Sequence, residues 1–212
     1  MQQHIILETK RLIIRNWQIS DKNVFFQLNS DPVVMQFFPA QKSQAEAALI
    51  MTEQTKMIEQ TGFGFYALEL KENIPTNNSI KKAPLVTSSL ASPPLTVGPK
   101  VIGMCGLLKT NLAPFIPTNT VEIGWRLLPQ YWGFGYITEA ASAILTYGFN
   151  TLKLPEIVSF AVQNNQRSIN VMERLGMNHQ KDKDFLHPRV PDSHPHLKRH
   201  VLYKKSNPYQ SI

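Results

Sequence analysis

Two glycines in the segment 130–135 carry the strongest chemical signal in the sequence. Gln130, Gly133 and Gly135 stand between an apolar run at 121–127, which reads as a strand, and a helical pattern that begins at 136. Glycines at such a turn let a ligand approach the backbone, and the first N–H groups of the following helix carry partial positive charge. This arrangement favours a bound phosphate group, with an ordinary tight turn as the alternative.

The same Gly-Phe-Gly pattern occurs a second time in the chain, but in a different structural context. Gly62 and Gly64 lead into a strand pattern rather than a helix, so a glycine pair alone does not identify a phosphate loop. At 130–135 a Walker loop is excluded because no Gly-Lys-Ser/Thr follows. A dinucleotide site is disfavoured because the third glycine and the acidic residue about 20 positions later are missing from their expected places.

Four histidines between 187 and 200 form a second group of residues that could do chemistry. His194, His196 and His200 have a spacing that a metal ion can use. The intervening prolines indicate an irregular loop, which would need an acidic or cysteine side chain as a fourth ligand. We therefore expect no metal site.

Hydrophobic periodicity predicts the elements that would position these residues. The predicted strands are 5–17, 63–70, 101–108, 121–127, 155–162 and 199–203. The predicted helices are 21–31, 43–60, 136–149 and 168–175. Gly176 follows the last helix, where a left-handed C-terminal residue is expected. The mixture of helices and strands predicts an α/β (α+β mixed) fold class.

Length and composition predict a single domain over residues 1–212, since 212 residues with 42% hydrophobic content can bury a core. The segment 73–99 has five prolines and no acidic residue, and is predicted to be a flexible insertion. It would serve as a lid or docking loop or, more simply, as a tolerated hairpin extension. Cys105 is the single cysteine, which excludes an intramolecular disulfide.

The charge and hydropathy pattern narrows the classes of partner. The net charge is +7, and its excess lies in 73–100 and in the tail 181–212. A stripe of basic residues with interleaved aromatics is missing, so nucleic-acid binding is not expected. No apolar run is long enough for a membrane helix, and residues 1–10 lack a secretory pattern, so we expect a cytoplasmic protein.

Four ordered blocks of the chain, at 7–15, 30–35, 122–140 and 165–177, resemble the GNAT acetyltransferase superfamily. Within that superfamily they are most similar to the branch of ribosomal-protein N-terminal acetyltransferases. The loop 130–135 looks like the superfamily's Gln/Arg-x-x-Gly-x-Gly/Ala signature. The insertion at 73–99 has no counterpart in the family.

The resemblance implies a GNAT-like fold, with a central, mostly antiparallel, twisted sheet flanked by helices and splayed at the strand 121–127. It also implies acetyl-CoA as co-substrate, its pantetheine arm lying along that strand like an added strand. The implied cofactor-binding residues are Trp125, Arg126, Leu127, Gln130, Trp132, Gly133, Phe134, Gly135, Tyr136, Asn165, Ser168, Asn170 and Arg174.

Two catalytic residues are implied in the same way. Glu122 is expected to act as a general base through water, with an ordinary solvated carboxylate as the alternative. Many family members have a tyrosine where this sequence has Met172, so the thiol takes its proton from Ser168 or from solvent. The alternative is that Ser168 only caps the N-terminus of the following helix and takes no part in catalysis. His187 is expected either to touch the acceptor or only to pack its own loop.

The sequence thus predicts an N-acetyltransferase that moves the acetyl group of acetyl-CoA to a primary amine by direct attack in a ternary complex. The acceptor is expected to be a protein N-terminus or a small-molecule amine. An alternative is a catalytically idle module that binds acetyl-CoA as a sensor or binds a partner. No membrane partner is expected, and the chain is expected to be a monomer or a homodimer.

Overall fold

The computed structural model describes residues 4–71 and 100–209, so the predicted insertion at 73–99 lies outside the described residues. Within them the chain has a mixed α/β fold built on one nine-stranded sheet, as predicted. The strands are β1 Ile5–Glu8, β2 Leu12–Arg15, β3 Gly64–Leu70, β4 Lys100–Lys109, β5 Val121–Leu127, β6 Glu156–Val162, β7 Asn178–His179, β8 Phe185–Leu186 and β9 Arg199–Ser206. The α-helices are α1 Lys22–Ser30, α2 Gln44–Thr61, α3 Tyr136–Asn150 and α4 Gln166–Arg174.

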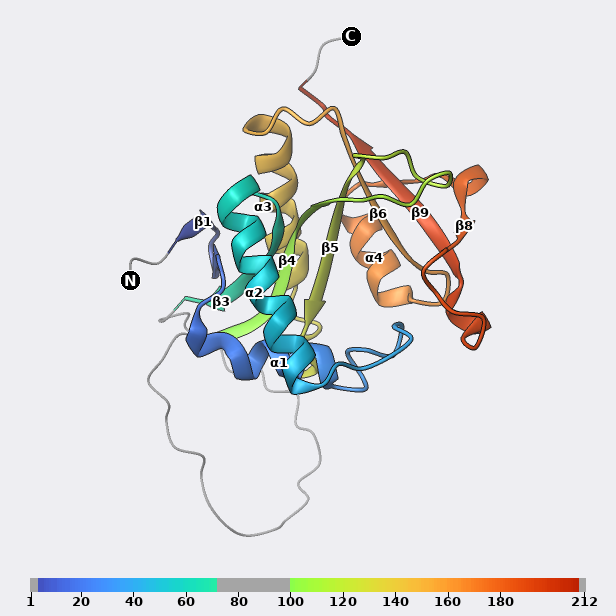
Figure 1. The fold of residues 1–212 in the computed structure, drawn as a ribbon. Helices are drawn as coiled ribbons and strands as arrows, with labels where there is room; N and C mark the ends of the chain where they lie inside the picture. The colour runs from blue at the N-terminus through green and yellow to red at the C-terminus, as the bar shows by residue number, and fades with distance from the viewer. Residues whose placement is uncertain (1–3, 72–99, 210–212) are drawn as a thin grey trace.

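The order of the sheet is β1-β2-β3-β4-β5-β6-β9-β7, with β8 beside β9 (Figure 1). All pairings are antiparallel except the parallel pairing of β5 with β6. β5 pairs with β4 along its whole length, whereas its register with β6 is the single pair Glu122 and Val158. The sheet therefore opens between β5 and β6 beyond that pair.

Helices cover both faces of the sheet. In Figure 1, α1 and α2 lie in front of the sheet, where α2 packs on β3 and α1 on β4, and α3 lies behind β4 and β5. Residues two apart on a strand share a face. Ile123 and Leu127 of β5 thus belong to the core beneath α3, and Arg126 reaches Asn29 of α1 on the other face. Glu122 shares that second face with Arg126.

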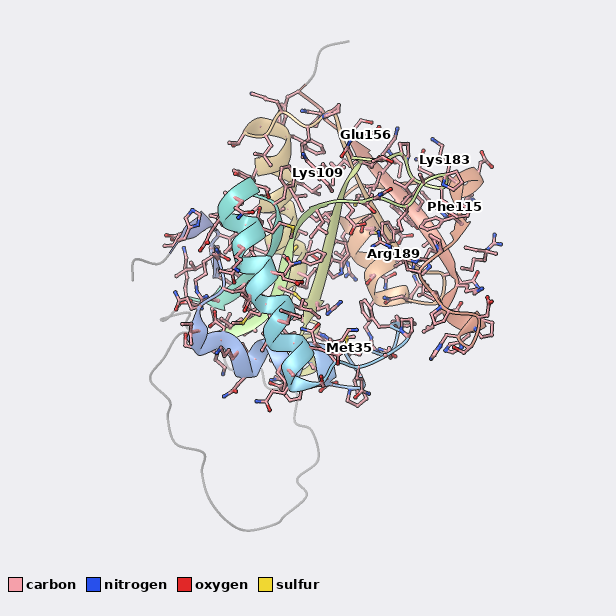
Figure 2. All side chains as sticks on the ribbon, in the orientation of Figure 1. Met35, Lys109, Phe115, Glu156, Lys183 and Arg189 are labelled. Carbon is pink, nitrogen blue, oxygen red and sulfur yellow. The ribbon has the colours of Figure 1, made fainter. Side chains whose placement is uncertain are left out.

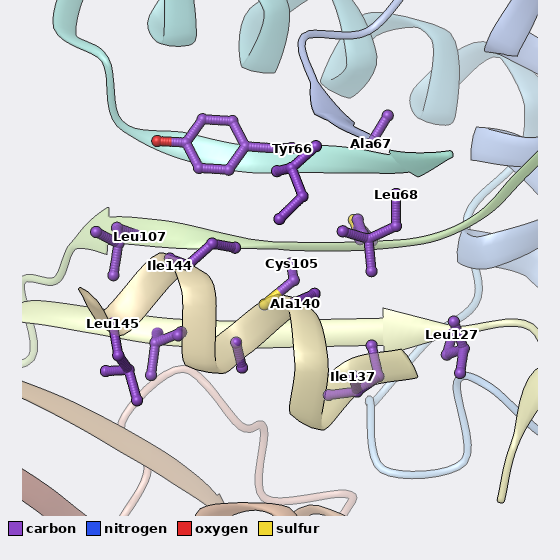
Figure 3. Packing of buried hydrophobic residues seen from close by; sticks show 14 of the residues in the cluster. Tyr66, Ala67, Leu68, Cys105, Leu107, Leu127, Ile137, Ala140, Ile144 and Leu145 are labelled. Atoms are coloured by element: carbon purple, nitrogen blue, oxygen red, sulfur yellow. The ribbon is translucent and has the colours of Figure 1, made fainter. Parts of the chain in front are cut away.

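The core beneath α3 follows directly from the helical period of its sequence. Figure 3 shows Ala140 and Ile144 of α3 beside Cys105 and Leu107 of β4, and Ile137 nearer to Leu127 of β5. All six side chains are buried. Because these apolar residues recur at three- and four-residue intervals, they lie on one helix face and fix the start of α3 against the sheet.

Several predicted boundaries are confirmed. β5 has the predicted bounds, and α3 begins at the predicted residue 136. Gly62 ends α2 with φ 72°, and Gly176 follows α4 with φ 67°, both left-handed as glycine allows.

Three predictions of local structure were wrong or incomplete. The strand predicted at 5–17 is two strands, β1 and β2, joined by a turn in which the Thr9 N–H donates to the Leu12 carbonyl. α4 begins at Gln166 because Asn165, rather than Ser168, caps it. β7 and β8 were not predicted, since two residues show no alternation.

Candidate functional site

A cleft of about 1330 Å³ opens where β5 and β6 separate. Its walls are β5, the glycine loop with the start of α3, β6 with the start of α4, and two loops at 33–39 and 187–190. Figure 2 labels Met35 on the first of these loops and Arg189 on the second. Small-molecule pockets are usually about 300–1000 Å³, so this cleft has room for an elongated ligand and a second one.

The backbone of β5 presents an edge to this cleft. The Ile123 carbonyl accepts a hydrogen bond from Ser159 Oγ at 2.9 Å, and the Leu127 carbonyl accepts one from Trp132 Nε1 at 2.8 Å. Because residues two apart share one edge of a strand, Trp125 turns its N–H and C=O to the same side, where β6 has diverged. An extended ligand with amide groups can pair with β5 at this position.

The loop after β5 has the geometry of an anion site. Gly133 and Gly135 have φ values of 83° and 77°, in the left-handed region that glycine adopts without strain. A Cβ at Gly133 would meet nothing within 4 Å, so the backbone angle rather than crowding requires glycine. Gly135 is the N-cap of α3, and no side chain caps this helix. The N–H groups of its first turn are therefore available to a ligand.

An ion pair braces the loop from the turn between β1 and β2. Arg11 Nε donates to Glu139 Oε2 at 2.6 Å, and Arg11 Nη1 donates to the Phe134 carbonyl at 2.9 Å. The same guanidinium lies 4.4 Å above the ring of Tyr136, and Thr9 Oγ1 donates to Glu139 Oε1 at 2.6 Å. Arg11 thus offsets the charge of a carboxylate that would otherwise repel an anion from the start of α3.

Glu122 lies at the closed end of the cleft, where β5 and β6 still pair. Its Oε2 atom is buried and has no hydrogen-bond partner among the described residues. Burial raises the pKa of Glu122 to about 7, although a hydrogen bond with Thr110 and the charge of Arg189 act in the opposite direction. The carboxyl group is therefore partly ionised near neutral pH, which suits it to accept a proton.

Two neutral histidines face the cleft from the C-terminal part of the chain. The rings of His187 and His200 lie 4.8 Å apart, and both pack against Phe160. His187 Nδ1 accepts the Arg189 backbone N–H at 3.2 Å, and His200 Nδ1 donates to the Lys198 carbonyl at 3.0 Å. Burial, with the charges of His200 and Arg189, lowers the pKa of His187 to about 4, and burial also lowers the pKa of His200. Both side chains line the cleft.

The start of α4 brings further polar groups to the cleft. Asn165 Oδ1 accepts the Ser168 backbone N–H at 3.2 Å, which leaves the Ser168 hydroxyl free of the capping role. Asn165 and Ser168 both line the cleft, as do Asn170 and Arg174. Met172 is fully buried in the core and does not line it.

The structure brings nearly all the predicted site residues to one cleft. Gln130 is the exception, since it is exposed on the short 3₁₀ turn Pro129–Tyr131 and is not part of the lining. The predicted residues that line the cleft are Glu122, Trp125, Arg126, Leu127, Trp132, Gly133, Phe134, Gly135, Tyr136, Asn165, Ser168, Asn170, Arg174 and His187.

Several cleft residues were missed from the sequence. Arg167 stacks 4.1 Å above the ring of Trp132, and Arg189 and Phe38 come from the two loops. Arg167 lies inside the block 165–177 that resembles the family, so that block could have pointed to it. Variable loops such as those near 31–42 and 184–198 are where an acceptor pocket is expected from sequence, but no local pattern singles out Phe38 or Arg189 within them.

The histidines considered as metal ligands separate in the structure. The rings of His194 and His196 lie 6.1 Å apart, whereas His200 packs with His187 at the cleft. Among residues 4–71 and 100–209, no group of three or more His, Cys, Asp or Glu side chains is placed to hold a metal ion. In the same ranges no helix combines the length and the apolar character needed to cross a bilayer.

Comparison with known proteins gives consistent matches. The family model of the acetyltransferase (GNAT) domain matches residues 11–178. The uncharacterised N-acetyltransferase YnaD of Bacillus subtilis (strain 168) is 28% identical over 171 residues, which cover 81% of each chain.

Two solved structures show the same fold. RimL, a ribosomal L7/L12 alpha-N-protein acetyltransferase, superposes with a TM-score of 0.68 at 13% identity, over 97% of this chain and 96% of that chain. The microcin C7 self-immunity acetyltransferase MccE, solved in complex with acetyl-CoA and AMP, has a TM-score of 0.64 at 10% identity, over 93% of each chain.

Proposed function

Because the chain belongs to the GNAT acetyltransferase family and is an acetyl-CoA-dependent acetyltransferase, we propose that it acetylates a primary amine with Glu122 as general base. The amine attacks directly, in a ternary complex that both ligands form in the cleft between β5 and β6. Acetyl-CoA supplies a thioester, whose carbonyl carbon accepts the amine and whose sulfur leaves.

The residues of the cleft fit acetyl-CoA in three respects. The Trp125 backbone edge suits the amides of a pantetheine arm. The open N–H groups at Gly135 and the first turn of α3 suit a pyrophosphate. Arg167 and Arg174 add positive charge beside that loop and α4, where the nucleotide end would lie. A backbone N–H of β5 would also stabilise the charge that develops on the carbonyl oxygen.

One observation carries the assignment of the base, namely the buried, unpartnered Oε2 atom of Glu122 at the closed end of the cleft. Its pKa of about 7 lies close to that of an α-amine, about 8, and well below that of a lysine, about 10.4. Moving a proton to Glu122 through a water molecule is uphill by about 1.4 kcal/mol from an α-amine and by more than 4 kcal/mol, roughly, from a lysine. This difference in pKa favours an α-amine, such as a protein N-terminus, as the acceptor.

Ser168 is the candidate that would return a proton to the departing sulfur. Its hydroxyl is free because Asn165 caps α4, and it lines the cleft. Met172 is buried away from the cleft, so the residue at the tyrosine position of other family members takes no part. Thiols titrate near about 8.5, and the thiolate therefore needs little help.

A thiol-release assay across α-amines, free-N-terminus peptides and small amines tests this proposal with Glu122→Gln. We expect kcat/KM to fall by roughly 10²-fold at pH 7, because the amide cannot accept a proton. The wild-type rate should rise with pH through about 7, and the variant should show only the later rise of the amine itself near about 8.

Glu156→Gln is the matched control, since Glu156 pairs with Lys204 outside the cleft. Its pH profile should follow the wild type. Equal rates for Glu122→Gln and wild type at every pH would rule out the assignment of the base. Failure of every amine to release thiol would favour the alternative of an idle, cofactor-binding module.

A further inference from the structure

Arg126 places a positive charge in the cleft without a carboxylate beside it. Its side chain lies on the same face of β5 as Glu122 and lines the cleft. Its Nη1 donates to Asn29 Oδ1 at 2.5 Å, and the ring of Phe38 lies 4.2 Å from the guanidinium carbon. No Asp or Glu among the described residues forms an ion pair with Arg126.

Neighbouring groups fix the orientation of this guanidinium. Asn29 is buried, and its Nδ2 donates to the Phe25 carbonyl at 2.8 Å, so its Oδ1 is held toward Arg126. Phe38 covers one face of the planar cation. A guanidinium has five N–H groups, and Asn29 takes one of them, which leaves the others for a ligand.

The surroundings make an anionic ligand favourable. Burial lowers the pKa of Arg126 to about 10, so the group stays charged at neutral pH although it is partly desolvated. A second cation, Arg189, lines the cleft from the loop 187–190. The carboxylates that line the cleft are those of Glu122 and Glu139. Glu139 is already paired with Arg11. A desolvated cation of this kind gains from a charge-assisted, bidentate contact with a carboxylate.

We infer that Arg126 selects acceptors that carry a carboxylate as well as the reacting amine, and that the acceptor is the N-terminal segment of an acidic peptide or protein. This inference rests on the proposed function, because it takes the amine to lie at Glu122. Phe38 and the loop 33–39 form the wall along which the peptide passes.

The spacing along β5 indicates where the carboxylate lies in the acceptor. Glu122 and Arg126 are four residues apart on one strand, which is about 13 Å at 3.3 Å per residue. An extended peptide covers that length in about four residues. The acidic side chain should therefore be at the fourth or fifth residue of the acceptor, whereas a free amino acid is too short to reach both groups.

The test is a thiol-release assay with hexapeptides that have a free N-terminus and a single Glu at position 2, 3, 4 or 5, each compared with its Gln counterpart. We expect Glu at position 4 or 5 to raise kcat/KM by about 10-fold or more over Gln. Arg126→Gln should abolish this preference, and Arg126→Glu should reverse it toward peptides with Lys at the same position. If Arg126 had a purely structural role, its substitution would not change the preference between Glu and Gln peptides.

Arg167→Gln is the comparison variant, because Arg167 also lines the cleft but stacks on Trp132 beside the glycine loop. It should raise KM for acetyl-CoA and keep the preference for acidic peptides. If Arg126→Gln instead raises KM for acetyl-CoA and keeps that preference, the guanidinium serves the cofactor and the inference is wrong.

The remaining outcomes separate this inference from the proposed function. Equal turnover of the Glu and Gln peptides by the wild type overturns the inference alone. Turnover of small amines without any peptide turnover also overturns it, and leaves the acetyltransferase activity standing. No turnover of any amine overturns the proposed function, and the inference with it.

Discussion

The pKa values of two glutamates in one cleft, Glu122 and Glu139, are shifted in opposite directions by their surroundings. Glu139 is partly buried too, but hydrogen bonds from Thr9 and Arg11 outweigh this burial and lower its pKa. Glu122 has no comparable cation in hydrogen-bond contact, so burial dominates and raises its pKa to about 7. Divergent environments of this kind separate a proton-accepting carboxylate from a structural one. The sequence alone could single out Glu122 by family resemblance, but not the burial that gives it its basicity.

The same burial has a cost in stability that can be measured. The folded-state pKa of Glu122, about 7, is above the ordinary value of 4.5, so the group favours the folded state below pH 4.5 and loses this contribution as pH rises through 7. Glu122→Gln should therefore unfold at a higher temperature than the wild type at pH 8, by roughly 5 °C, and at the same temperature at pH 4.5. Thermal unfolding at the two pH values checks this. A stabilisation that is equal at both would contradict it.

At the scale of elements, the continuous unit of β5, glycine loop and α3 was the part best predicted. Its strand alternation, its two glycines and the helical period of α3 are local, so they are visible in sequence. α4 was predicted with a late start, because Ser168 and Asn165 are both good N-cap residues and only the backbone distinguishes them. The contacts of the Arg126 side chain with Asn29 and Phe38 were not predicted, since the resemblance concerned only the backbone of this residue.

The two glycine pairs provide a matched test of the loop. Gly133 and Gly62 have φ values of 83° and 72°, and a Cβ at either would meet nothing within 4 Å. Gly133→Asp and Gly62→Asp should each destabilise the fold by about 1–2 kcal/mol through backbone strain. Acetyl-CoA at about 100 times its Kd should raise the Tm of wild type and Gly62→Asp by roughly 5–10 °C, and leave Gly133→Asp unchanged. An equal shift in both variants would place the pyrophosphate elsewhere.

At the scale of the whole molecule, two walls of the cleft come from loops that lie far apart in the chain. The loop 33–39 follows α1, and the loop 187–190 lies between β8 and β9. Their meeting depends on how β9 adds to β6, beyond the opening in the sheet. The variable loops near 31–42 and 184–198 could be expected at an acceptor pocket, but no local pattern encodes these contacts, which is why Phe38 and Arg189 could not be singled out within them.

His187 and His200, in the C-terminal part of the chain, should make the stability of the fold decrease at acidic pH. His187 has a pKa of about 4 in the folded state, below the ordinary value of 6.5, and burial lowers the pKa of His200 as well. The stability that these neutral side chains contribute is present above pH 6.5 and is lost as pH falls through 4. The double variant H187Q/H200Q should thus lose less Tm than the wild type between pH 7 and 4.5, by roughly 5 °C.

His196→Gln, in the same segment but outside the cleft, is the control and should follow the wild type in this pH series. A double variant with the full acid sensitivity of the wild type would show that other groups titrate on unfolding.

β5 and β6 pair at a single register position, so beyond it each strand has an unpaired edge although both lie in the middle of the sheet. Unpaired strand edges at the rim of a protein invite other chains to add to them and aggregate. Here the two edges face each other across a wedge that closes at Glu122 and Val158 and is walled by loops on its open side. A narrow, single-stranded arm can enter such a wedge, whereas a foreign β-strand with side chains on both faces cannot. The unpaired edges of β5 and β6 thus lie inside the cleft, where the surrounding loops limit the access of other chains.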